Sequence, residues 1–160
     1  MASKTLRKVA GKEAKSARSG FAHRNMPLLL LHARENFVAH FRPILNTHGV
    51  TDQQWRIIRV LLDTGPLEHG DISRRCRISA ASLVGVLSRM EEIGHIRRKR
   101  LDDDRRRIQI SLTAKSRALA ARMAPEIEAS YARIEKLVGR DYCEQIYEML
   151  DKVISVLHIE

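Results

Sequence analysis

The stretch that decides the fold is residues 69–113, which read HGDISRRCRISAASLVGVLSRMEEIGHIRRKRLDDDRRRIQISLT. Its first half predicts two short helices, about 69–76 and 80–93, joined by the short link Arg77-Ile78-Ser79. Ser79 is suited to cap the second helix, and Gly94 is suited to end it because glycine readily adopts the backbone conformation that follows helices. Two short helices joined this tightly are typical of a helix-turn-helix.

The second half of the stretch predicts a hairpin. His95–Leu101 is a short and strongly basic strand candidate, Asp102–Arg105 is expected to turn, and Arg107–Leu112 alternates between polar and apolar side chains. Alternation with period two predicts a strand with one apolar face, so we expect a two-stranded hairpin. A hairpin directly after a helix-turn-helix indicates the winged form of that motif.

Two helices are expected on the N-terminal side of this segment. One covers residues 27–47 and should be disturbed near Pro43, because proline removes a backbone hydrogen bond. The other runs from a cap at Thr51 or Asp52 to about residue 63. Its apolar face should hold Trp55, Ile58 and Leu62.

Two more helices are expected after the hairpin. Thr113 should cap a long helix that Pro125 kinks, and Asp141 precedes a last helix with an apolar stripe. The stripes of the first and last helices are too large for a thin layer to hide, which favours a two-fold homodimer. We therefore predict a mainly α protein: a winged helix-turn-helix domain of residues 51–113 and a helical dimerisation region of residues 23–50 and 114–160.

Charge is distributed unevenly along the chain, whose formal net charge is +10. Residues 1–20 carry a net +5 and residues 95–107 a net +4, whereas residues 121–160 carry a net −3. This partition suggests a module that binds a polyanion, although a merely soluble basic protein would also have a high isoelectric point. Residues 1–22 are predicted to form a disordered basic arm.

The predicted winged segment has the features of a DNA-binding surface. A helix fits the major groove, small side chains permit close approach, and a helix N-terminus favours a phosphate. Arginine suits a narrow minor groove, and an aspartate can hold it in place through a bidentate pair. The candidates are Arg74, Arg75, Ser79, Ala80, Ala81, Ser82, Gly85, Arg89, Asp104, Arg105, Arg106 and Arg107. The alternative is that these charges are only solvated. Leu83, Val86, Leu87, Met90 and Ile93 are expected in the core.

Other functional classes have little support in the sequence. The longest apolar run, Leu28–Leu31, is too short for a membrane span, and no secretory signal core is present. Cys76 and Cys143 form no CxxC, so a reduced cytoplasmic location is expected. We expect no cofactor, no metal site and no enzymatic activity, because no cluster has metal-ligand spacing and no catalytic motif is found.

Two motifs in this order of elements resemble the MarR family of bacterial transcriptional regulators. VTDQQWR at residues 50–56 resembles that family's helix-2 opening. Asp104-Arg105-Arg106 followed by ISLT at residues 110–113 resembles its wing signature. The chain departs from the family at Ser116, where glycine is usual, and at Gly85, where a polar or basic reader is common. The resemblance covers about residues 27–157.

A narrower resemblance is to the HpaR branch, which regulates homoprotocatechuate degradation. It is carried by PLLLL at 27–31, ARE at 33–35 and FRPIL at 41–45. The resemblance implies a homodimeric repressor of an aromatic-acid operon on a palindromic operator in double-stranded DNA. It also implies a pocket for a small anionic effector of the homoprotocatechuate, hydroxyphenylacetate or hydroxynicotinate type. The candidate pocket residues are Arg24, Asn25, Arg34, His40, Trp55 and Arg59.

Two alternatives stay open at this point. Some MarR relatives sense oxidants through a cysteine near the first helix, whereas the first cysteine here is Cys76. The other alternative is a nonspecific architectural DNA-binding protein, which a comparison of promoter and random DNA at matched salt would distinguish.

Overall fold

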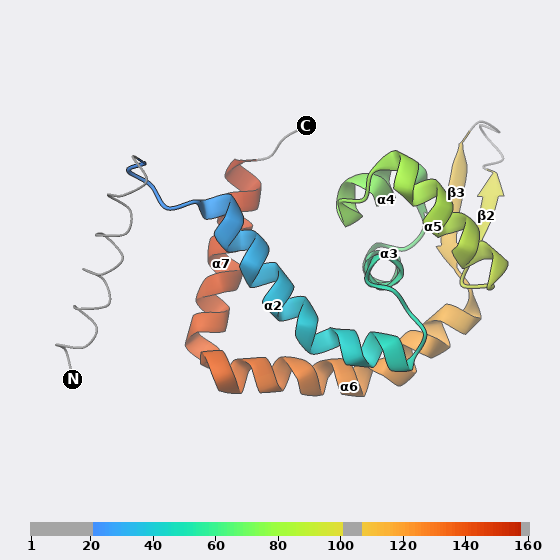
Figure 1. Ribbon diagram of the computed structural model, residues 1–160. Helices are drawn as coiled ribbons and strands as arrows, with labels where there is room; N and C mark the ends of the chain where they lie inside the picture. The colour runs from blue at the N-terminus through green and yellow to red at the C-terminus, as the bar shows by residue number, and fades with distance from the viewer. Residues whose placement is uncertain (1–20, 101–106, 158–160) are drawn as a thin grey trace. The chain divides into compact units, whose positions relative to one another are not determined.

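The structure is a computed structural model that describes residues 21–100 and 107–157. The described elements are, in order, α2 (Met26–Thr47), α3 (Asp52–Thr64), β1 (Leu67–Glu68), α4 (His69–Cys76), α5 (Ala80–Glu92), β2 (Ile96–Arg100), β3 (Ile108–Leu112), α6 (Ala114–Val138) and α7 (Arg140–Val156) (Figure 1). The predicted mainly α fold with a winged helix-turn-helix is confirmed. The expected basic arm, apart from residues 21 and 22, and the wing turn with Asp104, Arg105 and Arg106 lie outside the described residues.

The chain divides at Ala39, inside α2, into two compact units. Residues 21–39 of the first unit expose most of their side chains. The second unit, from His40 onward, holds the hydrophobic core. Both Pro43 and Pro125 lie inside helices, and α2 and α6 each continue through their proline as one element.

Helix α3 lies at the centre of the core, in contact with α4, α5, α6 and β3. Its fully buried side chains are Ile57, Ile58 and Leu61. The prediction that Trp55 and Leu62 share the buried face with Ile58 is only partly right, because both are partly buried at the edge of the cluster. Several elements pack on α3, so its buried stripe is broader than a single helical face. Other members of the cluster are Ile72, Leu83, Leu87, Met90, Ile110 and Met123.

Backbone and side-chain hydrogen bonds confirm the predicted start of α3 and the predicted end of α5. The Thr51 hydroxyl accepts from the Gln54 amide, and the Gln54 side chain accepts from the Thr51 amide, which forms a capping box. At the C-terminus of α5, His95 N donates to Met90 O at 2.7 Å, and Gly94 N donates to Glu91 O at 2.9 Å. These two bonds, with Gly94 at a φ of 72°, form a Schellman motif that ends the helix.

The wing is part of a three-stranded antiparallel sheet in the order β1-β3-β2. The predicted two-stranded hairpin is confirmed as the β2–β3 pair. The sequence did not predict the third strand, β1, whose Leu67 pairs with Ile110 of β3. A strand of two residues is too short to show alternation, so sequence patterning could not find it. Of the predicted apolar face of Ile108, Ile110 and Leu112, the last two are buried, whereas Ile108 is 40% exposed at the outer end of β3. Ile96 of β2 is also buried.

Helix α7 exposes most of its apolar side chains. In this helix only Cys143 is buried, and the exposed residues include Tyr142, Tyr147, Met149, Leu150, Val153, Ile154 and Val156. A contiguous apolar surface of this kind marks a protein–protein contact. None of the helices in the described ranges is long and apolar enough to span a membrane.

We expect this α7 surface to lie in a homodimer interface. Ile154 is 61% exposed, so Ile154→Glu would introduce a charge into an apolar contact without disturbing the core. Light scattering at micromolar concentration should show a dimer for the wild type and dissociation for Ile154→Glu. Lys152→Glu, on the same helix at an exposed polar position, is the matched control. A stable folded wild-type monomer would contradict the expectation.

Candidate nucleic-acid interface

Helix α5 has one face in the core and one in solvent. Leu83, Val86, Leu87 and Met90 are buried, as predicted. On the other side, the exposed or half-buried positions are Ala80, Ala81, Ser82, Val84, Gly85, Ser88, Arg89, Glu91 and Glu92. Five of the predicted DNA-binding residues therefore lie together on the solvent side of one helix, namely Ala80, Ala81, Ser82, Gly85 and Arg89, and the cap Ser79 is exposed beside them.

Ile93 is a correction to the predicted core. It is 43% exposed, because α5 ends at Glu92 and Ile93 follows as its cap residue. Its carbonyl accepts from the Lys115 ammonium at 2.6 Å. Ile93 therefore contributes its backbone carbonyl, and not its side chain, to the packing.

The first turn of α5 is fixed by Ser79. Its Oγ accepts from the Ser82 amide at 3.2 Å and donates to the Ser82 hydroxyl at 2.9 Å. The helix N-terminus carries a partial positive charge, and its residues Ser79, Ala80 and Ala81 are exposed to solvent. Backbone amides at such an end favour a phosphate.

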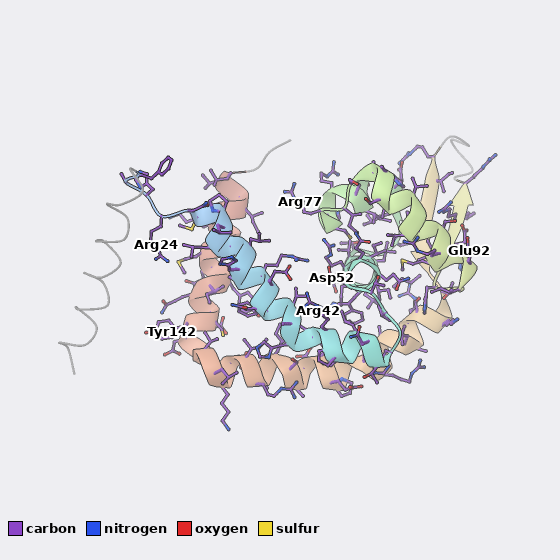
Figure 2. All side chains as sticks on the ribbon, in the orientation of Figure 1. Arg24, Arg42, Asp52, Arg77, Glu92 and Tyr142 are labelled. Atoms are coloured by element: carbon purple, nitrogen blue, oxygen red, sulfur yellow. The ribbon has the colours of Figure 1, made fainter. Side chains whose placement is uncertain are left out.

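The turn between α4 and α5 is held by side chains from elsewhere. Arg77 lies in this turn (Figure 2). Its φ is 49°, a left-handed conformation that is uncommon outside glycine. Arg56 Nη1 donates to the Cys76 carbonyl at 2.6 Å, and Ser73 Oγ donates to the Ile78 carbonyl at 2.7 Å. Sequence reasoning missed Arg56, because its partner lies 20 residues away and no local pattern links them.

Cationic side chains border the solvent face of α5 on the α4 side. Arg74 and Arg75 occupy the last turn of α4 and are both exposed. Arg74 forms an ion pair with Asp71 one turn earlier. This pair is exposed to solvent, so its contribution to stability is small and Arg74 can exchange its partner.

Arg107, another predicted DNA contact, is engaged within the sheet. Its Nε donates to Glu68 Oε1 of β1 at 2.9 Å, and Nη2 contacts the same oxygen. Arg98 of β2 lies 3.3 Å from the Glu91 carboxylate of α5. Carboxylates thus hold two wing arginines against neighbouring elements.

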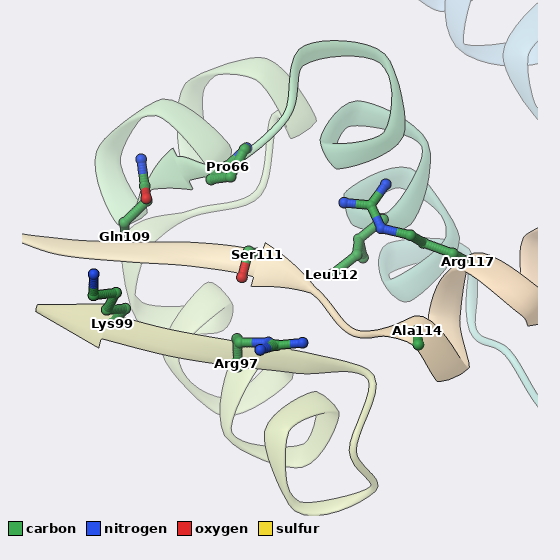
Figure 3. A pocket seen from close by; sticks show the side chains of 8 residues that line it. All are labelled: Pro66, Arg97, Lys99, Gln109, Ser111, Leu112, Ala114 and Arg117. Carbon is green, nitrogen blue, oxygen red and sulfur yellow. The ribbon is translucent and has the colours of Figure 1, made fainter.

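The outer face of the wing has a hollow of about 470 Å³ (Figure 3). Lys99 lies opposite Gln109, and Arg97 lies opposite Ser111, across the β2–β3 pair. Arg117 of α6 adds a third cation, which the sequence did not single out. The hollow is also lined by Pro66, Leu112 and Ala114. No acidic side chain lines it among the described residues, so this face attracts anions.

A buried hydrogen-bonded pair joins the root of the wing to α6. Ser116, at the position where a glycine was expected, donates from Oγ to the His95 carbonyl at 2.7 Å. Because a hydroxyl has one hydrogen, Oγ accepts from His95 Nδ1, which lies at 2.8 Å. Burial lowers the pKa of His95, and the nearby Lys115 ammonium lowers it further. The imidazole is therefore held neutral.

The predicted effector residues fall in both units. In the first unit, Asn25 Oδ1 accepts from the Leu28 amide, and Arg34 pairs with Glu35 at 2.6 Å. Arg24 is exposed. In the second unit, the His40 carbonyl accepts from the Ser130 hydroxyl at 3.1 Å. Trp55 is partly buried against the core and Arg59 is exposed.

Both cysteines are buried. Burial raises the pKa of the Cys76 thiol, and the Arg56 guanidinium opposes this with a smaller effect. Because the thiolate is the reactive form, a buried thiol with a raised pKa is poorly suited to sensing oxidants. Within the described residues, no group of three or more His, Cys, Asp or Glu side chains is placed to hold a metal ion.

Comparison with known proteins gives consistent matches. The MarR family model matches residues 48–107. The chain is 36% identical over 134 residues to the homoprotocatechuate degradative operon repressor of Escherichia coli, covering 84% of this chain and 90% of that protein. It is 34% identical to the HTH-type transcriptional regulator FarR of Neisseria gonorrhoeae, with 84% and 92% covered. The crystal structure of NadR in complex with 4-hydroxyphenylacetate matches with a TM-score of 0.76 and 35% identity, covering 88% of this chain and 97% of that chain.

The His95–Ser116 pair should make stability depend on pH. The folded-state pKa of His95 lies below its usual value of 6.5, so the unfolded chain takes up a proton first as pH falls. The free energy of unfolding is then fully retained above pH 6.5 and decreases as pH falls from 6.5 toward the folded-state pKa. Urea unfolding at fixed protein concentration should show a smaller decrease for His95→Gln. Equal pH slopes for the two proteins would contradict this role.

Proposed function

Because the chain belongs to the MarR family of transcriptional regulators, we propose that it represses an operon for aromatic-acid catabolism and that a small hydroxylated aromatic acid releases it from DNA. It acts by binding and not as an enzyme. The observation that carries the proposal is the solvent face of α5, where small side chains and a helix N-terminus adjoin exposed arginines.

In this proposal, residues 51–113 bind DNA and residues 23–50 and 114–160 form the homodimer. Helix α5 enters the major groove, with Ser79 and Arg89 at its two ends and Ala80, Ala81, Ser82 and Gly85 close to the bases. Arg74 and Arg75 bind phosphates. The wing reaches the minor groove with Arg105, Arg106 and Arg107, and Asp104 orients Arg106. For this contact Arg107 exchanges its partly exposed Glu68 partner for DNA. Two such helices in a two-fold dimer read a palindromic operator in double-stranded DNA.

The effector is proposed from the relatives and from chemistry. The Escherichia coli relative is a repressor of homoprotocatechuate degradation, and NadR has been crystallised with 4-hydroxyphenylacetate. Each of these compounds combines a hydroxylated ring with a carboxylate. Arginine pairs with a carboxylate, and an aromatic side chain packs against a ring. Arg24, Arg34 and Arg59 are the proposed cations, with Asn25, His40 and Trp55 as further ligand contacts.

The wing proposal is tested with Arg106→Ala. The probe is the duplex that the wild-type protein enriches most strongly from a random library. Loss of a specific arginine contact should weaken binding by about 1–3 kcal/mol at physiological salt. Arg122→Ala, an exposed arginine on α6, is the control and should bind like the wild type. Unchanged affinity of Arg106→Ala would count against the wing assignment, and failure to enrich any sequence would favour architectural binding.

The effector proposal is tested by two titrations with 4-hydroxyphenylacetate: the selected duplex with and without the acid, and the acid with and without the duplex. A coupling of about 1–3 kcal/mol changes affinity by roughly five- to 150-fold, and linkage requires the same factor in both titrations. Arg34→Gln should weaken binding of the acid and leave DNA binding in its absence unchanged. If the acid binds without changing the affinity for DNA, release by this class of acid is wrong and DNA recognition stands.

A further inference from the structure

Val84 is an apolar side chain on the side of α5 that does not face the core. It is 57% exposed, whereas its neighbour Leu83 is fully buried. Residues three and four positions apart share a helix face, so Val84 lies with Ala80, Ala81 and Ser88. All four are exposed or half-buried.

The fold does not explain a valine at this position. Val84 is neither a member of the core cluster nor one of the partly buried residues packed against it. A β-branched side chain also loses rotamer freedom in a helix, so valine is a weaker helix former than alanine. A single exposed apolar residue is common on protein surfaces. Val84, however, lies in the middle of the face that we propose enters the major groove, where its apolar side chain can contact a base.

The surroundings of Val84 allow a base edge to come close. Ala80 and Ala81 carry only methyl groups, and Gly85 carries no side chain. A Cβ built on Gly85 would lie 3.8 Å from Arg89 Nη1, so the Arg89 guanidinium folds back along the helix beside the glycine. Val84 is thus a branched apolar group among small side chains, and the Arg89 guanidinium lies beside Gly85.

An apolar side chain distinguishes the bases because it can neither donate nor accept a hydrogen bond. In the major groove, adenine, guanine and cytosine present polar donors and acceptors, which a valine would leave without a partner. Thymine presents its C5-methyl group, which gains from contact with another apolar group. We propose that Val84 is a specificity-determining residue that reads the C5-methyl of one thymine in each operator half-site. This inference rests on the proposed DNA-binding function of α5.

The test replaces the thymines of the selected duplex, one symmetric pair at a time, by deoxyuridine. This removes only the methyl group and keeps base pairing. At one position, wild-type affinity should fall by roughly fourfold per half-site, the ratio expected for one buried methyl group. Val84→Ser should bind the thymine and deoxyuridine duplexes equally at that position. Val84→Ile, which keeps the apolar branches, is the matched control and should retain the difference.

The outcomes separate this inference from the function on which it rests. If wild-type affinity is the same for every deoxyuridine duplex, the reading by Val84 is overturned and sequence-specific binding stands. If Val84→Ser keeps the full methyl effect, another side chain reads the thymine, and the inference is also overturned. If the protein enriches no sequence at all, the proposed function itself has failed.

Discussion

The placement of α5 depends on the turn that precedes it. Arg77 takes a left-handed conformation, and the flanking carbonyls of Cys76 and Ile78 are held by the side chains of Arg56 and Ser73 at 2.6 and 2.7 Å. Peptide carbonyls left without partners would be costly here, because the turn is packed against α3. These bonds set the rotation of α5 about its own axis. If α5 were rotated by the angle between two successive residues, Val84 would be buried and Leu83 exposed. The turn therefore determines which side of α5 faces the core and which side faces solvent.

A second set of hydrogen bonds places the wing. The Schellman motif at Gly94 ends α5, the Thr113 hydroxyl donates to the Gly94 carbonyl at 2.7 Å, and Ser116 holds both the ring and the carbonyl of His95. These hydrogen bonds therefore connect the C-terminal end of α5 and the start of the wing to the first turn of α6. A displacement of the first turn of α6 must either break these bonds or carry the wing with it. This is a physical route by which a change in a helical region reaches the DNA-binding segment.

Local signals in the sequence predicted most of the secondary structure, because capping serines, threonines and glycines act within a few residues. The features that were missed depend on tertiary contacts. The strand β1 exists only because Leu67 and Glu68 pair with β3, and Arg56 acts on a carbonyl far along the chain. Val84 was named neither as core nor as a DNA contact, because it lies outside the apolar stripe of this helix and single exposed apolar residues are common. The proposed effector residues, such as Arg34 and Trp55, depend on side-chain placement that periodicity does not specify.

Charge around the solvent face of α5 is more balanced than the net charge of +10 implies. Arg74, Arg98 and Arg107 each lie against a carboxylate, contributed by Asp71, Glu91 and Glu68 respectively. These pairs are partly exposed, so they contribute little to stability, but they orient the guanidinium groups and reduce the local positive potential. A reduced potential weakens attraction to any phosphate backbone, and that sequence-independent attraction supplies most nonspecific binding. The base contacts that we propose for α5 would then contribute a larger share of the total affinity, which is the condition that favours a sequence-specific regulator over an architectural protein.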